Sequence, residues 1–266
     1  MTPPQPSDTW QLGNPYERYV GRWSRLVAPA FLTWLRVPAG QRWLDVGCGT
    51  GALCSAILAQ CDPASVTGVE PSDGFLKVAR DTLPDGVTLC AGHAAAIPLA
   101  DGAVDAVVSG LVLNFVPELD TALDEITRVA AKGATFGAYV WDYAGKMELM
   151  RHFWDAAVAL DPAAATLDEG KRFPLCQPDA LLAQLGGAGF GNAEVIAIDV
   201  ATPFASFDDF WQPFLGGQGP APAYAMSLDE AARSRLKDKL RAQIPTRSDG
   251  SIALMARAWA VRASIG

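Results

Sequence analysis

The sequence lacks a long apolar run, an excess of positive charge and any abundance of histidine. Its most apolar stretch, residues 103–116, contains Asp105 and Asn114, so it is too short and too polar to span a bilayer. Lysine and arginine number 21 against 29 aspartates and glutamates, which gives a net charge of −8. Proteins that bind nucleic acid or anionic membranes usually carry a basic face. These deficits predict small-molecule partners and argue against nucleic acid and membranes.

Cysteine is also scarce. The five cysteines are an odd number, and their spacing shows no pairs. This usage predicts reduced thiols and a cytoplasmic location rather than a disulfide framework. The polar, proline-rich start MTPPQPSDTW has no cationic and apolar segment of the kind found in signal peptides. A chain of 266 residues that is 50% hydrophobic can bury a full core without a metal. We therefore expect one large domain or a domain and a half, as a monomer or homodimer, with no metal site.

Apolar runs alternate with helical patterns along the first half of the chain. The runs are continuous rather than alternating, which is typical of parallel strands covered on both faces. Strands are predicted within residues 42–51, 65–72, 86–92, 103–115, 134–143, 192–201 and 251–263. The pattern predicts an α/β fold built on a mostly parallel sheet.

The same patterns predict how the chain is divided. A tail and one or two helices, interrupted by Gly21 and Pro29, precede the core, and two insertions separate its later parts. The predicted segments are 1–40 (tail and cap helices), 41–145 (cofactor-binding core), 146–177 (first lid insertion), 178–202 (core helix and strand), 203–250 (second lid insertion) and 251–266 (terminal core strand).

A glycine-rich turn follows the first predicted strand, and such a turn brings the backbone close to a ligand. Gly47, Gly49 and Ala52 satisfy the dinucleotide pattern G-x-G-x-x-G/A, with Glu70 about 20 residues further on where a ribose-binding acid belongs. An NAD-type oxidoreductase is therefore one interpretation. Asp45 favours another, because a carboxylate there would repel a pyrophosphate but suit the ammonium and sulfonium of S-adenosylmethionine.

Several segments in order resemble class I S-adenosylmethionine-dependent methyltransferases, in the small-molecule branch called methyltransferase type 11. These segments are LDVGCGTG (44–51), GVEPS (68–72) and GHAAAIPLADGAVDAVVSGLVLNFV (92–116). The resemblance implies a Rossmann-like fold with a seven-stranded mostly parallel sheet, helices on both faces and a helical lid. It implies transfer of a methyl group from S-adenosylmethionine to a small molecule. A protein that binds this cofactor without catalysis is the alternative from another class.

The resemblance also implies roles for individual residues. Asp45 and the backbone of Gly47 and Gly49 would hold the methionyl part, and Glu70 the ribose hydroxyls. His93 stands where many relatives have aspartate. The remaining implied cofactor contacts are Pro71, Ser72, His93 and Ala94 around the adenine, the Ser109 carbonyl and Leu111 near the ammonium, and Tyr16 and Arg22 from the lead-in helix.

The aromatic residues point to the substrate. Of the 24 aromatic residues, only five lie between positions 41 and 140, and the flanks and insertions hold the rest. We therefore expect an aromatic-lined lid over a small apolar or aromatic substrate, although the same rings could simply pack the lid. The predicted substrate residues are Trp141, Trp154, Trp211 and Tyr224, and the candidate bases for an in-line displacement are His152, Asp142 and Tyr143.

Overall fold

The computed structural model describes residues 20–217 and 219–266, and these form one seven-stranded sheet with the strand order β3-β2-β1-β4-β5-β7-β6. Every neighbouring pair from β3 to β5 is parallel, whereas β7 runs antiparallel to both β5 and β6. The strands are β1 (Arg42–Val46), β2 (Ser65–Glu70), β3 (Val87–Ala91), β4 (Val104–Gly110), β5 (Ala130–Trp141), β6 (Gly191–Phe204) and β7 (Ile252–Ser264). The predicted mostly parallel sheet is confirmed.

Burial along the strands explains why their sequence patterns differ. Central β4 is buried along nearly its whole length, because helices cover both of its faces. By contrast, β6 at the sheet edge alternates between exposed and buried residues over its second half. Sequence periodicity therefore located all seven strands. Strand β6 ends three residues beyond its predicted end at position 201, and β7 ends one residue beyond its predicted end at position 263.

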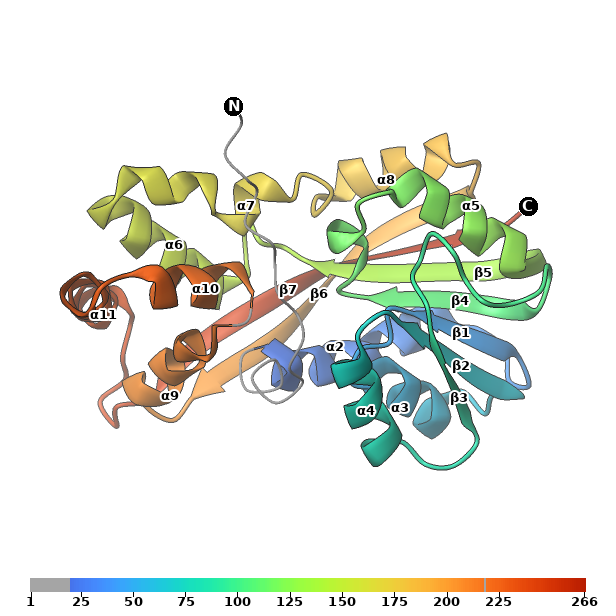
Figure 1. Cartoon of the computed structure of the whole chain (residues 1–266), viewed down its shortest axis with the longest axis horizontal. Helices are drawn as coiled ribbons and strands as arrows, with labels where there is room; N and C mark the ends of the chain where they lie inside the picture. The colour runs from blue at the N-terminus through green and yellow to red at the C-terminus, as the bar shows by residue number, and fades with distance from the viewer. Residues whose placement is uncertain (1–19, 218) are drawn as a thin grey trace.

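Helices cover the sheet on both sides, as Figure 1 shows. On one side lie α2 (Arg22–Leu35), α3 (Ala52–Gln60) and α4 (Asp73–Thr82). On the other side lie α5 (Leu119–Val129) and α8 (Pro178–Gly187). Pro29 lies inside α2 without ending it, so the described part of the predicted lead-in segment is a single long helix that starts after Gly21.

A helical layer extends beyond this sandwich, at the ends of the long strands β6 and β7 (Figure 1). Its core is aromatic, with the Phe153 and Phe214 rings stacked at 4.5 Å and Trp154 lying 5.6 Å from Tyr224. The layer consists of α6 (Glu148–Leu160), η3 (Pro162–Thr166), α7 (Glu169–Arg172), α9 (Phe207–Trp211), η4 (Gln212–Gly216), α10 (Pro220–Ser227) and α11 (Glu230–Gln243). No helix in the described part of the chain has both the length and the apolar character of a bilayer span.

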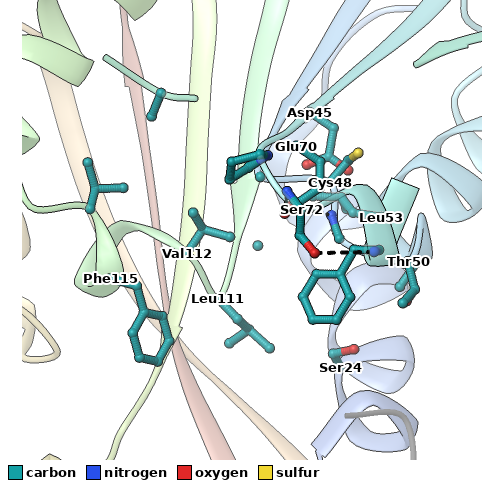
Figure 2. A pocket seen from close by; sticks show the side chains of 18 of the residues that line it. Ser24, Asp45, Cys48, Thr50, Leu53, Glu70, Ser72, Leu111, Val112 and Phe115 are labelled. Carbon is teal, nitrogen blue, oxygen red and sulfur yellow. Dashed lines mark hydrogen bonds between the residues drawn. The ribbon is translucent and has the colours of Figure 1, made fainter. Parts of the chain in front are cut away.

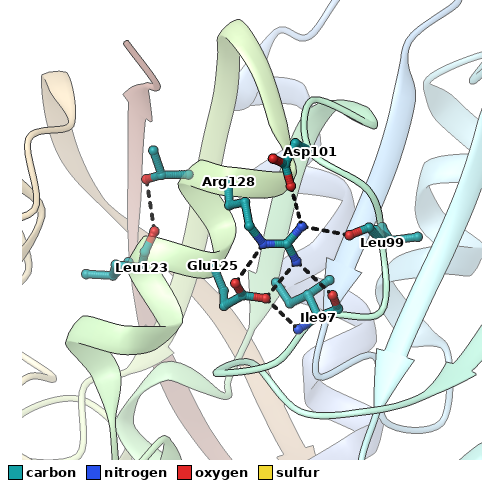
Figure 3. Close-up of polar contacts among 7 residues, drawn as sticks. Ile97, Leu99, Asp101, Leu123, Glu125 and Arg128 are labelled. Atoms are coloured by element: carbon teal, nitrogen blue, oxygen red, sulfur yellow. Dashed lines mark hydrogen bonds and ion pairs between the residues drawn. The ribbon is translucent and has the colours of Figure 1, made fainter.

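A network centred on Arg128 of α5 fixes the loop between β3 and β4, as shown in Figure 3. Its guanidinium donates to the carbonyls of Ile97 and Leu99 at 3.0 and 2.8 Å. It also pairs with Glu125 at 2.7 Å and Asp101 at 2.8 Å. Glu125 in turn accepts from the Ile97 backbone N–H at 2.9 Å. The loop is therefore held to α5 by the backbone of Ile97 and Leu99 and by the side chain of Asp101.

Candidate functional site

A cavity of about 310 Å³ opens at the carboxyl ends of β1, β2, β4 and β5. It lies where the strand order reverses between β1 and β4, which is the usual binding position in open α/β sheets. Eleven of the residues predicted from the sequence line it, namely Asp45, Gly47, Gly49, Glu70, Pro71, Ser72, His93, Ala94, Leu111, Trp141 and Tyr143. Folding therefore gathers residues from the predicted motifs around one space.

The glycine turn forms one wall of the cavity, and its glycines have different functions. Gly47 and Gly49 both have positive φ, of +74° and +54°. A Cβ on Gly47 would lie 2.6 Å from the Val112 side chain, so this position must stay bare for β1 and β4 to approach. A Cβ on Gly49 would meet no atom within 4 Å. Since Gly49 lines the cavity, its exposed backbone leaves room for a ligand.

Glu70, at the end of β2, is held in place before any ligand binds. Its Oε2 accepts from the Gly49 N–H at 3.1 Å, and its Oε1 accepts from the Ser72 N–H at 2.9 Å. Burial raises the pKa of this carboxyl, and the two backbone donors oppose that effect. A carboxylate has about four acceptor sites, so Glu70 can also accept from two neighbouring hydroxyls of a ligand.

Asp45, at the end of β1, is almost completely buried beside Glu70. Cys54 donates its S–H to Oδ2 at 3.2 Å, whereas the buried Oδ1 has no partner among the described residues. Burial, with a smaller contribution from the nearby Glu70 charge, raises the pKa of Asp45 to about 7. Figure 2 shows both carboxylates on the same side of the cavity. A buried acceptor without a partner is costly, so this atom suits a ligand donor, above all a cationic one.

The opposite side of the cavity is formed after β4, where Figure 2 shows Leu111, Val112 and Phe115. Leu111 has a φ of +64°, an unusual conformation for a residue with a side chain, and its N–H donates to the Tyr139 carbonyl at 2.7 Å. Ser109, whose carbonyl was predicted to lie near the ammonium, is fully buried and does not line the cavity. Its hydroxyl donates to the Val46 carbonyl at 2.9 Å and ties β4 to β1.

His93 and Ala94 reach the cavity from the loop that Arg128 holds. The His93 side chain is exposed to solvent, and its carbonyl accepts from the Ala96 N–H at 2.9 Å. The position of His93 therefore depends on the loop backbone and not on packing of the imidazole.

The far end of the cavity is apolar and includes residues that were not predicted. Phe115, Tyr139 and Met150 line it together with Trp141 and Tyr143. Phe115 and Tyr139 occur near the carboxyl ends of β4 and β5, so the direction of the predicted strands could have identified them as cavity residues. Met150 comes from α6, and only tertiary packing brings that helix to the cavity.

Two predicted bases lie elsewhere. The Asp142 carboxylate accepts from the Gly145 and Lys146 N–H groups, both at 3.0 Å, and so caps the turn after β5. His152 is a half-buried residue of α6. Neither residue lines the cavity, whereas Tyr143 does.

Four more predicted residues in the described part of the chain also lie outside the cavity. Trp154, Trp211 and Tyr224 belong to the aromatic core of the helical layer, where Trp211 is 6.0 Å from the Phe214 ring. Arg22 lies over the Trp23 and Phe204 rings and pairs with Asp209 at 3.2 Å. Val20 and Ser24 line the cavity from this end of the chain instead. Tyr16 is outside the described residues.

Comparisons with known proteins agree with this geometry. Residues 44–137 match the family described as the methyltransferase domain. A malonyl-[acyl-carrier protein] O-methyltransferase of Geobacter sulfurreducens is 33% identical over 162 residues, which cover 59% of this chain and 58% of that enzyme. A demethylmenaquinone methyltransferase of Renibacterium salmoninarum is 39% identical over 112 residues, which cover 42% of this chain and 44% of that enzyme. The chain thus matches less than two thirds of either relative's length.

Solved structures extend the similarity beyond the matched segment. A candidate methyltransferase from Bacillus halodurans superposes with a TM-score of 0.59 at 15% identity, and the superposition covers 89% of this chain and 97% of that one. At this identity the likeness concerns the fold. The strand order and the superposition show that the chain has the Rossmann-like fold of class I methyltransferases, and residues 44–137 are similar to the methyltransferase domain.

Proposed function

We propose that this protein is an S-adenosylmethionine-dependent methyltransferase that acts on a small apolar molecule. The observation that carries the proposal is the unpartnered, buried Oδ1 of Asp45 in the same cavity as the braced carboxylate of Glu70. One acidic group suits the ammonium of the cofactor and the other suits its ribose hydroxyls. The bare backbone at Gly49 leaves space between them.

The chain's own residues would hold the cofactor in the following way. Asp45 would accept from the ammonium, and Glu70 would accept from the two ribose hydroxyls. When bound, the cofactor supplies an electrophilic methyl group on a sulfonium. Pro71, Ser72, His93 and Ala94 lie where they would surround the adenine.

Catalysis would then depend mainly on alignment and the exclusion of water. An acceptor at the apolar end of the cavity would face the methyl group in line with its bond to sulfur, and such positioning can supply much of the rate enhancement. Of the three predicted bases, Tyr143 is the one that lines the cavity, so it is the group that we propose to contact the acceptor.

Calorimetry with S-adenosylhomocysteine and with NAD tests the cofactor assignment. We expect S-adenosylhomocysteine to bind and NAD to fail, because Asp45 would lie close to the pyrophosphate. Binding of NAD without S-adenosylhomocysteine would instead support an oxidoreductase. Turnover of the labelled methyl group with a panel of phenols, amines and carboxylates separates an enzyme from a protein that only binds the cofactor.

The remaining proposals concern the whole protein. We propose a cytoplasmic protein, a monomer or homodimer, with no nucleic acid partner, in keeping with its net charge of −8. Size-exclusion chromatography with light scattering tests the oligomeric state.

A further inference from the structure

The apolar end of the cavity has an aromatic side chain behind its wall. Phe115 and Tyr143 line the cavity, and Phe173 contacts both of them from outside. Its ring centroid lies 4.9 Å from that of Phe115, at an interplanar angle of 75°, and 5.5 Å from that of Tyr143, at 51°. Phe173 thus connects two cavity walls that come from different strands.

The short segment before Phe173 is fixed by buried polar contacts with α6. Asp168 pairs with Arg151 at 2.6 Å and also caps α7 through the Gly170 N–H at 2.9 Å. Glu169 is buried and accepts from the Trp154 indole. Breaking a buried pair of this kind is strongly destabilising, so Phe173 is attached to a rigid support.

This support also contacts the cavity wall directly. Gly170 packs against the chain at Tyr143, where a Cβ would lie 3.1 Å from the Tyr143 carbonyl oxygen. A side chain here would crowd the chain just after β5, so the glycine favours the close approach of α7. Together with Phe173, it holds the strand end that carries Tyr143.

The charges around the cavity distinguish between classes of acceptor. Among the described residues that line it there is no lysine or arginine, and its two carboxylates are Asp45 and Glu70. The opposite end is formed by Leu111, Phe115, Trp141 and Met150 together with Tyr143. An anionic acceptor would lose its hydration there without gaining a cationic side chain.

We propose that the acceptor is a neutral, flat ring system that packs against Phe115 and Tyr143, and that Phe173 is the positioning residue that holds these two rings at the cavity wall. This inference rests on the proposed function, because it assigns the acceptor end of the same cavity. Aromatic rings favour edge-to-face and offset contacts with such a partner.

Two probes with the same ring system test the class of acceptor. We would titrate 2-naphthol and 2-naphthoate into the full chain saturated with S-adenosylhomocysteine, by calorimetry at neutral pH. We expect 2-naphthol to bind at least about ten-fold more tightly, because the carboxylate of 2-naphthoate would be desolvated without a counter-ion. Equal or tighter binding of 2-naphthoate, or no binding of 2-naphthol, would overturn the proposal.

Variants of Phe173 test its positioning role. Phe173→Ala should weaken 2-naphthol binding by about ten-fold and leave the dissociation constant of S-adenosylhomocysteine within about two-fold, since one aromatic contact behind each wall is lost. Phe173→Leu should have a smaller effect in the same direction. It serves as the test variant if the alanine variant fails to fold.

Phe190→Ala is the matched control. Phe190 is as buried as Phe173 and packs edge-on against Phe136 at 5.1 Å, but it does not line or brace the cavity. We expect it to leave both dissociation constants unchanged, and an equal loss of 2-naphthol binding in both variants would show that Phe173 acts only through stability. Failure of S-adenosylhomocysteine to bind the wild-type protein would overturn the proposed function itself. Titration of the probes into the protein without added ligand would then test the aromatic end by itself.

Discussion

Asp45 and Glu70 are buried carboxylates whose pKa values both lie above the ordinary range. The backbone donors of Gly49 and Ser72 partly offset the cost of burying the Glu70 charge, whereas one oxygen of Asp45 has no donor in the described part of the chain. The pKa of Asp45 rises from 3.8 to about 7, so its ionisation destabilises the ligand-free fold as pH rises through this window. A bound ammonium would stabilise the same charge, which links ligand binding to the state of this residue.

The pH dependence of binding follows from this linkage. Below about pH 7 a growing fraction of Asp45 is protonated and neutral, so the affinity for S-adenosylhomocysteine should fall as pH falls from 8 to 5. Calorimetry across this range measures the slope. Asp45→Asn should bind more weakly and remove most of the slope, whereas an unchanged slope in this variant would assign the titration to another group.

Glu70→Ala should weaken the binding of S-adenosylhomocysteine by about ten- to a hundred-fold, because hydrogen bonds to a charged group contribute about 1.5–3 kcal/mol. The substitution also removes the acceptor that braces the Gly49 and Ser72 N–H groups. Glu70→Gln is the matched variant, since it keeps the shape and one acceptor, and it should be less affected. A dissociation constant that does not change in Glu70→Ala would remove Glu70 from the cofactor site.

At the scale of single elements, the Arg128 network connects α5 to the loop that carries His93 and Ala94. The pKa of Glu125 is lowered to about 2, first by its hydrogen bond with Arg128, so the carboxylate stays ionised well into the acidic range. The network also satisfies the backbone groups of Ile97 and Leu99. Local sequence therefore places the loop after β3, but a contact with a distant helix determines its conformation.

Arg128→Met should loosen this loop and weaken the binding of S-adenosylhomocysteine several-fold, because the adenine contacts would have to be ordered on binding. In the wild-type structure the Ala96 amide donates to the His93 carbonyl, and hydrogen exchange at this amide should be faster in the variant. Lys77→Met is the control, since it removes an exposed ion pair with Asp81 on α4. If both variants behave alike, the network has no specific role at the site.

On the scale of the whole molecule, the helical layer has an aromatic core of its own, and α6 is one of the elements that join it to the sheet. Met150 of α6 lines the cavity, whereas Phe153 and Trp154 on the same helix pack into the helical layer. One helix thus connects the stability of the layer with the shape of the acceptor end. Trp154, Trp211 and Tyr224, which were predicted to contact the substrate, pack inside this layer and do not line the cavity.

Trp211→Ala tests whether this ring stabilises the helical layer or contributes to ligand binding. Trp211 is 3% exposed in the layer, so its truncation should lower the free energy of unfolding by about 3–5 kcal/mol. The dissociation constant of S-adenosylhomocysteine should stay nearly unchanged at a temperature where the variant is folded. Chemical denaturation and calorimetry measure the two quantities, and a large loss of affinity with unchanged stability would return Trp211 to the ligand site.

The sequence by itself determined the sheet, the glycine turn and the acidic residues at the ends of β1 and β2. These features follow from apolar periodicity and from turn geometry, which act over a few residues and leave a direct trace in the sequence. Glu70 and Gly49 could be assigned in this way, because their positions follow from the strand ends.

Only the tertiary structure decided which aromatic residues face the cavity. Phe115, Tyr143 and Phe173 meet across segments far apart in the chain, and Asp142 turns to cap its own loop. The sequence around a tryptophan such as Trp211 does not distinguish a ring that packs inside a helical layer from one that lines a cavity. Long-range packing makes that choice, because an aromatic side chain is buried wherever the neighbouring helices leave space for it.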